Sequence, residues 1–297
     1  MFLISGITGN VGGAAARVLL DQGHALRALV RDPAKAAAWA ARGVELIHGS
    51  LEDAGAITRA LDGVAAAFVM IPPNIAPRPG FPEARAQIAS YQAALRNAPP
   101  PRLVVLSSVG SQQTSGLGLI TVTHLFEQAL AECTMPKAVI RPGSFLENYA
   151  FALDAAAATG WFDTFLTPLD RPVPLIASDD IGREVARWLT AAPWTGTNIV
   201  ELGTRQSPVE LARALSEVTG RNVQPRAIPR AHWSAVLEQM GWPAGGTAGF
   251  EEMEDGVNRG WIDFGVEGTL PVASTITPAK FFADLQAKKA RGGSATG

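Results

Sequence analysis

The segment Gly6-Ile7-Thr8-Gly9-Asn10-Val11-Gly12 lies near the start of the chain, and its three glycines stand three residues apart. An apolar run at residues 2–5 precedes it, and a helical pattern from residue 11 to about residue 21 follows it. Glycines at this spacing permit a tight turn, let the backbone approach a pyrophosphate, and bring the helix close to the strand. The segment predicts a dinucleotide-binding turn with Gly6, Gly9 and Gly12 at the cofactor; the alternative is a glycine-rich turn that binds nothing.

Short apolar runs alternate with helical patterns from this segment to Arg141. We expect strands at residues 2–5, 25–30, 44–47, 65–71, 103–106 and 137–140, and helices at residues 11–21, 34–41, 54–61, 83–96 and 119–131. Parallel strands need such crossover connections, which place helices on both faces of the sheet. We predict an α/β fold: a Rossmann-type doubly wound parallel sheet with a smaller C-terminal α+β cap region.

The alternation loosens after Arg141. We expect a NAD(P)-binding Rossmann domain at residues 1–150, a smaller substrate and cap region at 151–290 interleaved with it, and a flexible tail at 291–297. Ser178, followed by two aspartates, predicts the N-cap of a helix at residues 181–190. Ser207-Pro208-Val209-Glu210 predicts the start of a helix that ends near residue 219. Residues 198–202 should form a strand, and residues 278–289 the last helix.

The composition narrows the class of protein. Of 297 residues, 47% are hydrophobic and 18% charged, so the chain can bury a large core. The net charge of −2 and the lack of a basic run argue against nucleic acid or an anionic membrane as partner. No apolar stretch is long enough to span a membrane. The single cysteine, Cys133, favours the cytoplasm, the histidines show no metal-ligand spacing, and a homodimer is compatible with the sequence.

The end of the second expected strand bears on the choice of dinucleotide. Arg31 stands nineteen residues after Gly12, and Asp32 and Lys35 follow it. An acid at this strand end would bind the 2′-hydroxyl of NAD(H), whereas an arginine accepts the 2′-phosphate of NADP(H). We therefore expect NADP(H), held by Arg31 with help from Lys35. NAD(H) stays open if the strand ends one residue later, and both charges could also be plain surface residues.

Several segments together resemble the NmrA-like group of atypical short-chain dehydrogenases. These are the glycine segment, Val30-Arg31-Asp32-Pro33-Ala34-Lys35, Ser107-Ser108-Val109-Gly110, and Arg141-Pro142-Gly143-Ser144-Phe145-Leu146-Glu147-Asn148. Later segments fit the same pattern, so the resemblance covers nearly the whole chain. Members of the group include NAD(P)H-dependent quinone and triphenylmethane-dye reductases, as well as catalytically silent regulators that sense NADP(H).

The resemblance implies positions for the cofactor. It places the pyrophosphate at Thr8, Asn10 and Val11, and the 2′-phosphate at Arg31 and Lys35. It places the remaining cofactor contacts in three later segments: Ile71, Pro72 and Pro73 along the adenosine ribose, Ser107 and Ser108 near the nicotinamide, and Pro142, Gly143, Ser144 and Phe145 as its wall. One position departs from the group, because an aspartate common near the adenine is Ser50 here.

The acid–base pair of ordinary short-chain dehydrogenases is missing. These enzymes use Tyr-x-x-x-Lys, in which the lysine lowers the tyrosine pKa for proton exchange. Neither Tyr91 nor Tyr149 has a lysine four residues on. The resemblance places the lysine four residues before a glutamate that is Glu127 here, which puts Leu119 and Thr123 at the tyrosine and lysine positions. Their loss argues against alcohol dehydrogenase, epimerase and dehydratase chemistry. It does not exclude hydride transfer to an electrophilic acceptor.

His124 is the titratable residue nearest to these vacant positions, and it is our candidate proton donor; the alternative is a helix residue that only packs. Glu127, further along the same expected helix, is interpreted as a structural or surface charge.

Aromatic residues gather after the sixth expected strand, where open α/β sheets bind ligands. Tyr149, Trp161 and Phe162 could line a pocket for a flat aromatic acceptor, although core packing would explain them equally well. We therefore expect an NADPH-dependent oxidoreductase that transfers hydride to a quinone- or dye-like small molecule. The alternatives are a non-catalytic NADP(H)-sensing regulator that binds a protein partner and, third, an isomerase or lyase with bound cofactor.

Overall fold

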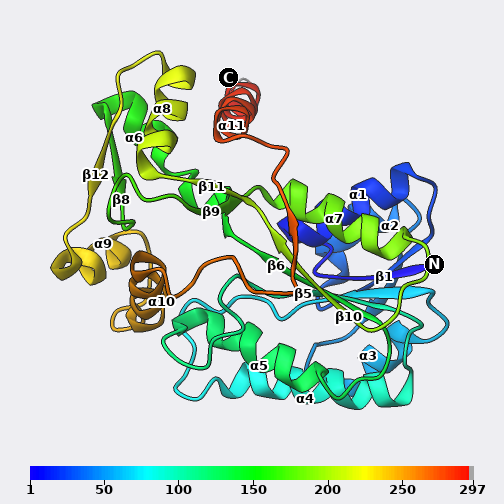
Figure 1. The fold of residues 1–297 in the computed structure, drawn as a ribbon. Helices are drawn as coiled ribbons and strands as arrows, with labels where there is room; N and C mark the ends of the chain where they lie inside the picture. Colours follow the sequence, from blue (N-terminus) through cyan, green and yellow to red (C-terminus); the bar gives the residue numbers. More distant parts are fainter. Residues whose placement is uncertain (294–297) are drawn as a thin grey trace.

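The computed structural model describes residues 1–293, and in this range a parallel eight-stranded sheet forms the centre of the molecule (Figure 1). Its order is β13-β10-β6-β5-β4-β1-β2-β3. The strands are β1 (Phe2–Ser5), β2 (Leu26–Val30), β3 (Glu45–His48), β4 (Ala66–Val69), β5 (Leu103–Leu106), β6 (Lys137–Pro142), β10 (Thr197–Leu202) and β13 (Leu270–Val272). The chain order reverses between β1 and β4, where ligands of doubly wound folds bind. The predicted Rossmann-type fold is confirmed.

Helices cover both faces of this sheet. One face carries α1 (Asn10–Asp21), η1 (Pro33–Ala36), α2 (Ala37–Ala40) and α7 (Ser178–Thr190), and the other carries α3 (Ala54–Leu61), α4 (Pro82–Asn97) and α5 (Thr121–Leu130) (Figure 1). Successive strand residues face opposite sides. Accordingly, Phe2 and Ile4 enter the core beneath α1 and α7, whereas Leu3 enters the core above α3 and α4. Each layer is held by its own apolar cluster.

Helices α1 and α7 cross at very short range. A Cβ atom placed on Gly182 would lie 2.4 Å from Cβ of Ala14 and 2.7 Å from the backbone nitrogen of Ala15. Both alanines are almost fully buried. The two helices cannot separate without opening the core, so the small residues at this crossing fix where α1 lies on the sheet.

A cap stands at one end of the sheet (Figure 1). It holds two small sheets, β11-β9-β7 and β12-β8, and the helices around them. Its elements are β7 (Ser144–Phe145), η3 (Leu146–Tyr149), α6 (Ala152–Thr159), β8 (Trp161–Thr164), β9 (Val173–Ile176), β11 (Thr204–Gln206), α8 (Pro208–Thr219), β12 (Gln224–Ala227), η4 (Arg230–His232), α9 (Trp233–Gln239), α10 (Ala248–Arg259) and α11 (Pro278–Gly293). After residue 150 the chain also supplies α7, β10 and β13 to the main sheet. The predicted domain boundaries themselves stay a prediction.

The start of α8 agrees with its sequence signal. The Ser207 side chain accepts from the Glu210 backbone N–H, and the Glu210 carboxylate accepts from the Ser207 N–H at 2.7 Å. With Pro208 at the first helical position, this capping box satisfies N–H groups that the helix leaves open. The helix ends at Thr219, as predicted.

The start of α7 differs from the prediction. Ser178 is the first residue of the helix rather than its N-cap, and its N–H and hydroxyl both donate to Glu147 Oε1, at 2.9 and 2.5 Å. Asp180 accepts from the Ser274 hydroxyl at 2.7 Å and from the Thr275 and Ile276 N–H groups, each at 2.9 Å. These partners come from distant parts of the chain, so a local capping pattern could not reveal them.

The C-terminal helix is also longer than expected. Residues 291–293, which we assigned to a flexible tail, belong to α11, and the rest of that tail lies outside the described residues. Among residues 1–293, no helix combines the length and apolar character needed to cross a membrane.

Replacing Gly182 by alanine should lower the free energy of unfolding by about 2 kcal/mol, because the new methyl group overpacks the crossing with α1. Gly55→Ala is the matched control, since a Cβ there meets only the ends of the Asp53 and Arg59 side chains. Its stability should equal that of the wild type or exceed it slightly. Urea unfolding followed by circular dichroism measures both. Equal stability of the two variants would contradict the packing described at α1.

Candidate functional site

The glycine loop, residues 6–12, turns tightly between β1 and α1. The Gly9 N–H donates to the Gly6 carbonyl at 2.9 Å. A Cβ on Gly12 would lie 2.3 Å from that same carbonyl oxygen and 2.7 Å from the Ser5 oxygen, so a larger residue cannot fit. Within residues 1–293 no side chain caps α1, whose N-cap is Gly9. The first-turn N–H groups and the positive end of the helix dipole are therefore open to an anion.

The two halves of the sheet are tied together beneath the loop. The Tyr91 hydroxyl lies 3.0 Å from the Ser5 hydroxyl, at the end of β1, and donates at 3.4 Å to the carbonyl of Met70, which follows β4. Burial raises the pKa of Tyr91 to about 12, although both of these hydrogen bonds oppose the shift. Tyr91 thus links the ends of β1 and β4, between which the strand order reverses, and it is a poor proton donor at neutral pH.

Two cations stand beside the loop at the end of β2; we call Arg31 and Lys35 the cationic tip. Because β2 ends at Val30, Arg31 occupies the strand-end position, as the sequence indicated. Both side chains are exposed, and neither forms an ion pair in the part of the chain that the structure describes. Asp32 instead caps η1, with its Oδ1 accepting from the Ala34 N–H at 3.0 Å. The tip thus keeps uncompensated positive charge next to the helix terminus.

The remaining segments assigned to the adenosine follow neighbouring strands. Ile71 is buried after β4, and Pro72 and Pro73 beside it are exposed. Ser50, which replaces the common aspartate, uses its hydroxyl to accept from the Glu52 N–H at 3.2 Å. Since the carboxyl ends of parallel strands meet at one sheet edge, these segments share the edge that carries the glycine loop.

A buried ion pair lies between the ends of β5 and β6. Arg141, only 4% exposed, contacts Glu127 of α5 through Nη2–Oε2 at 2.5 Å and Nε–Oε1 at 2.9 Å. The Ser107 hydroxyl donates to the same carboxylate. Ser108 turns to its own neighbour and donates to the Val109 carbonyl at 3.1 Å. Glu127 is therefore a structural charge that fixes Ser107 at the predicted nicotinamide side.

A chain of hydroxyl groups connects the Arg141–Glu127 pair to Thr123, which occupies the vacant lysine position. Ser107 Oγ lies 3.0 Å from Ser111 Oγ, which lies 2.7 Å from Oγ1 of Thr123. We did not predict Ser111 from the sequence, although it stands four residues after Ser107 and Thr123 offers a second hydroxyl group nearby. Thr123 places a neutral hydroxyl group at the position where the lysine would place an ammonium group. It cannot lower the pKa of a neighbour as an ammonium would.

His124 is held by the same loop. Its Nδ1 lies 2.8 Å from the Ser111 carbonyl oxygen. A carbonyl only accepts, so Nδ1 carries the proton and a neutral ring keeps Nε2 as an acceptor. His124 could then donate a proton through Nε2 only when doubly protonated. Its catalytic role stays a prediction.

The segment after β6 packs closely on the cap. Pro142 and Gly143 are buried, and a Cβ on Gly143 would lie 2.5 Å from the backbone of Pro174. Ser144 and Phe145, the two residues of β7, are half-buried. This wall of the predicted nicotinamide position is rigid because backbone meets backbone there.

The three aromatic residues assigned to a substrate pocket differ in their surroundings. Tyr149 is 9% exposed, and its ring centroid lies 6.2 Å from that of Phe162, which is fully buried. Trp161 is exposed, with the Arg226 guanidinium 5.1 Å from its ring. Burial and the nearby Glu254 charge raise the pKa of Tyr149 far above its usual range. Substrate contact by these residues stays a prediction. Because Phe162 is fully buried, it could only support the side chains that contact a substrate.

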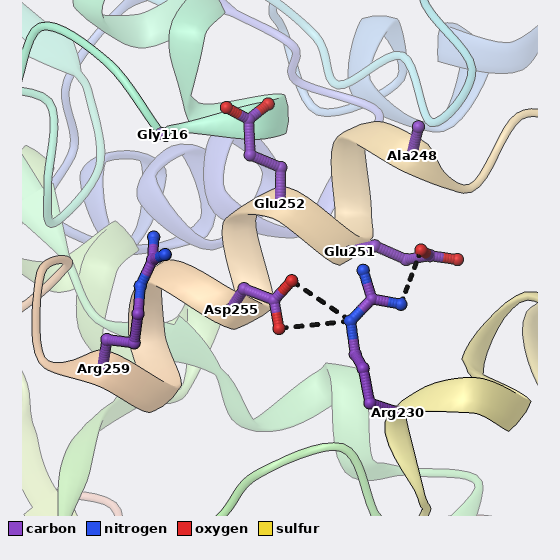
Figure 2. Close-up of a pocket in the computed structure, with 7 residues that line it drawn as sticks. All are labelled: Gly116, Arg230, Ala248, Glu251, Glu252, Asp255 and Arg259. Atoms are coloured by element: carbon purple, nitrogen blue, oxygen red, sulfur yellow. Dashed lines mark hydrogen bonds and ion pairs between the residues drawn. The ribbon is translucent and has the colours of Figure 1, made fainter.

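A cavity of about 430 Å³ is lined mainly by residues of α10, and we call it the outer cavity (Figure 2). Figure 2 shows Arg230 between Glu251 and Asp255, which it contacts at 2.7 and 3.1 Å. The remaining lining residues are Gly116, Ala248, Glu252 and Arg259. None of the predicted site residues lines it, and its charged walls do not suit a flat apolar acceptor. Within residues 1–293, no group of three or more acidic, histidine or cysteine residues could hold a metal ion.

Comparison with known proteins identifies the family of the chain. The model of the NmrA-like family matches residues 1–262. An NAD(P)H azoreductase from Xenophilus azovorans is 29% identical over 299 residues, which cover 96% of each chain.

Solved structures give the same picture of the fold. An NADPH-dependent quinone oxidoreductase from Escherichia coli matches with a TM-score of 0.77 and 26% identity, over 96% of this chain and 100% of that one. Triphenylmethane reductase from Citrobacter sp. matches with a TM-score of 0.78 and 22% identity, over 97% and 99% of the two chains. At 22% identity, the likeness to triphenylmethane reductase shows the fold alone.

Replacing Glu127 by glutamine should lower the free energy of unfolding by about 3 kcal/mol, because it leaves the buried Arg141 guanidinium without its counter-charge. Asp284→Asn is the matched control: it breaks the exposed pair with Lys280 and should cost at most about 0.5 kcal/mol. Thermal unfolding in the absence of nucleotide measures both. If E127Q unfolds like D284N, the pair does not support the β5–β6 edge.

Proposed function

The chain belongs to the NmrA-like family, and from that premise we propose that it is an NADPH-dependent oxidoreductase that transfers hydride to an aromatic acceptor of the quinone or dye type. One observation carries the proposal: the uncapped N-terminus of α1 lies over the glycine loop, next to the cationic tip. The azoreductase and the quinone oxidoreductase that resemble the chain support the same reaction class.

The residues present fit a dinucleotide with a 2′-phosphate. The first-turn N–H groups at Asn10 and Val11 would bind the pyrophosphate, because Gly9 and Gly12 leave room for its approach. Arg31 and Lys35 would hold the 2′-phosphate through charge-assisted hydrogen bonds. NADP(H) is favoured over NAD(H), since one oxygen of Asp32 is already engaged with the Ala34 N–H. When bound, the reduced nicotinamide supplies the hydride.

The acceptor site would be formed where the main sheet meets the cap. Ser107 is fixed there by Glu127, and β7 is fixed by the close contact of Gly143 with Pro174. These groups orient the reactants and exclude water rather than exchange protons. With Leu119 and Thr123 in place of the tyrosine and lysine, the site suits an acceptor that is electrophilic enough to take hydride directly.

The same vacancy favours a second candidate, a non-catalytic NADP(H)-sensing regulator. One titration series separates the two functions. The purified protein is titrated with NADPH and NADH by calorimetry and then mixed with a panel of quinones, azo compounds and triphenylmethane dyes. Tight NADPH binding with turnover of at least one acceptor supports the oxidoreductase. Tight binding with no turnover across the panel supports the regulator, and no binding of either nucleotide contradicts both.

Removing the guanidinium at the cationic tip should separate the two nucleotides. Arg31→Ala loses a charge-assisted contact of about 1.5–3 kcal/mol, so the Kd for NADPH should rise by roughly 10- to 100-fold while that for NADH stays nearly unchanged. Calorimetric titration measures both constants. Arg226→Ala, which removes an exposed arginine paired with Asp163 in the cap, should alter neither. An equal effect of R31A on NADPH and NADH would exclude Arg31 as the 2′-phosphate ligand.

A further inference from the structure

The acidic residues of α10 divide between two faces. Glu251, Glu252 and Asp255 line the outer cavity, as Figure 2 shows. Glu254 lies on the inner face and is only 8% exposed. Its neighbours on that face are apolar, because Phe250 and Val257 of the same helix pack against the clusters of the cap. The Glu254 side chain thus lies mostly buried beside apolar neighbours, with its carboxyl oxygens not fully shielded from solvent.

The inner face of α10 meets the carboxyl edge of the main sheet. A Cβ on Gly118 of η2 (Gly118–Ile120) would lie 1.9 Å from the Gly249 carbonyl oxygen and 2.7 Å from the Met253 nitrogen, so the two backbones touch. The next residue, Leu119, occupies the vacant tyrosine position. On the other side, the Glu254 charge acts on Tyr149, which follows the predicted nicotinamide wall. The helix that carries Glu254 therefore touches the segment after β5, and the Glu254 side chain lies close enough to the segment after β6 for its charge to act on Tyr149.

Glu254 differs from the other buried acids of the described chain. Asp180 binds the segment at residues 274–276, Glu184 accepts from Trp188, and Glu201 accepts from two backbone N–H groups. Glu254 forms no hydrogen bond and no ion pair within residues 1–293. An unpaired carboxylate is costly in such surroundings, and burial, followed by the charge of Asp255, raises the pKa of Glu254 to about 7.

We propose that Glu254 is the acid that protonates a quinone-type acceptor during its reduction, in place of the missing tyrosine; this assignment rests on the proposed function. The quinone takes a hydride, with its two electrons, from the reduced nicotinamide, which is thereby oxidised. The O–H bond of the Glu254 carboxyl group breaks, and its proton passes to a quinone oxygen. The product is the hydroquinone, and solvent returns a proton to the carboxylate.

Few other charged groups bear on Glu254. Tyr149 faces it from η3, and Asp255 is its neighbour in the helix. The η2 segment contributes no titratable side chain. Glu238 of α9 accepts from the Gly245 N–H, and Arg230 of η4 is engaged with Glu251 and Asp255 on the outer face. Arg171 also reaches α10, where its guanidinium donates to the Asn258 carbonyl and lies 3.9 Å from Asp263. Within residues 1–293 neither arginine forms an ion pair with Glu254, so nothing on these elements offsets the effect of burial on its pKa.

A comparison of two acceptors tests the role of Glu254. Reduction of a quinone takes up one proton, whereas a cationic triphenylmethane dye becomes a neutral product by taking hydride alone. Glu254→Gln should slow quinone reduction by about 100-fold and leave dye reduction within about twofold of wild type. The wild-type quinone rate should fall as the pH rises above about 7, and the dye rate should not. Glu252→Gln, on the outer face of the same helix, is the matched control and should leave both rates unchanged.

A measurement without nucleotide or acceptor supplies an independent readout. Because the folded pKa of Glu254 is raised, ionisation destabilises the wild-type fold as the pH rises from about 4.5 to 7. The E254Q variant should therefore melt like the wild type at pH 4.5 and at a higher temperature than the wild type at pH 8. The E252Q variant should follow the wild type at both pH values.

The outcomes separate this assignment from the proposed function. If E254Q slows both acceptors equally, or neither, or if its melting temperature follows that of the wild type at every pH, Glu254 is not the proton donor and the oxidoreductase stands. If the wild type binds NADPH but reduces neither acceptor, the proposed function fails and this assignment fails with it.

Discussion

The close approach of backbone to backbone around α1 is the constraint on which the structure depends. Gly12 leaves no space for a Cβ against the Gly6 carbonyl, and Gly182 leaves none against Ala14. The first contact sets the start of the helix directly over β1, and the second fixes the helix against α7. The open first-turn N–H groups are therefore held in one position by packing, before any anion arrives, so binding need not order them.

The elements of the first half could be predicted because their signals are local. Apolar runs, glycine turns and helix starts identified β1 through β6 and the capping box at Ser207, and the strand end at Val30 placed Arg31 at the tip. Ser178 was misread because its partner, Glu147, lies 31 residues away in the sequence. The burial of Glu254 was equally hidden, since neighbouring acids of the same helix face solvent. Tertiary contacts, not propensity, decide such positions.

The charged side chains fall into two groups, those that are paired within the fold and those that are left without a partner. Arg141 and Glu127 neutralise each other and hold Ser107, and Asp180 anchors the chain before α11. By contrast, Arg31 and Lys35 keep their charge free at the surface, and Glu254 is buried with no counter-charge among the described residues. The exposed cations are stabilised by water, whereas a buried and unpaired carboxyl group such as Glu254 costs stability and marks a candidate functional group. Arg31 and Lys35 follow the carboxyl end of β2, whereas Glu254 lies in α10 of the cap.

Amide hydrogen exchange with and without NADPH tests the central claim most directly, because it reports on the backbone groups themselves. We expect slower exchange on binding at residues 6–13, where the glycine loop and the first turn of α1 would contact the pyrophosphate. Exchange at residues 251–259, beside the outer cavity, should change much less. Unchanged exchange at residues 6–13 under saturating NADPH, or protection confined to the outer cavity, would contradict the account.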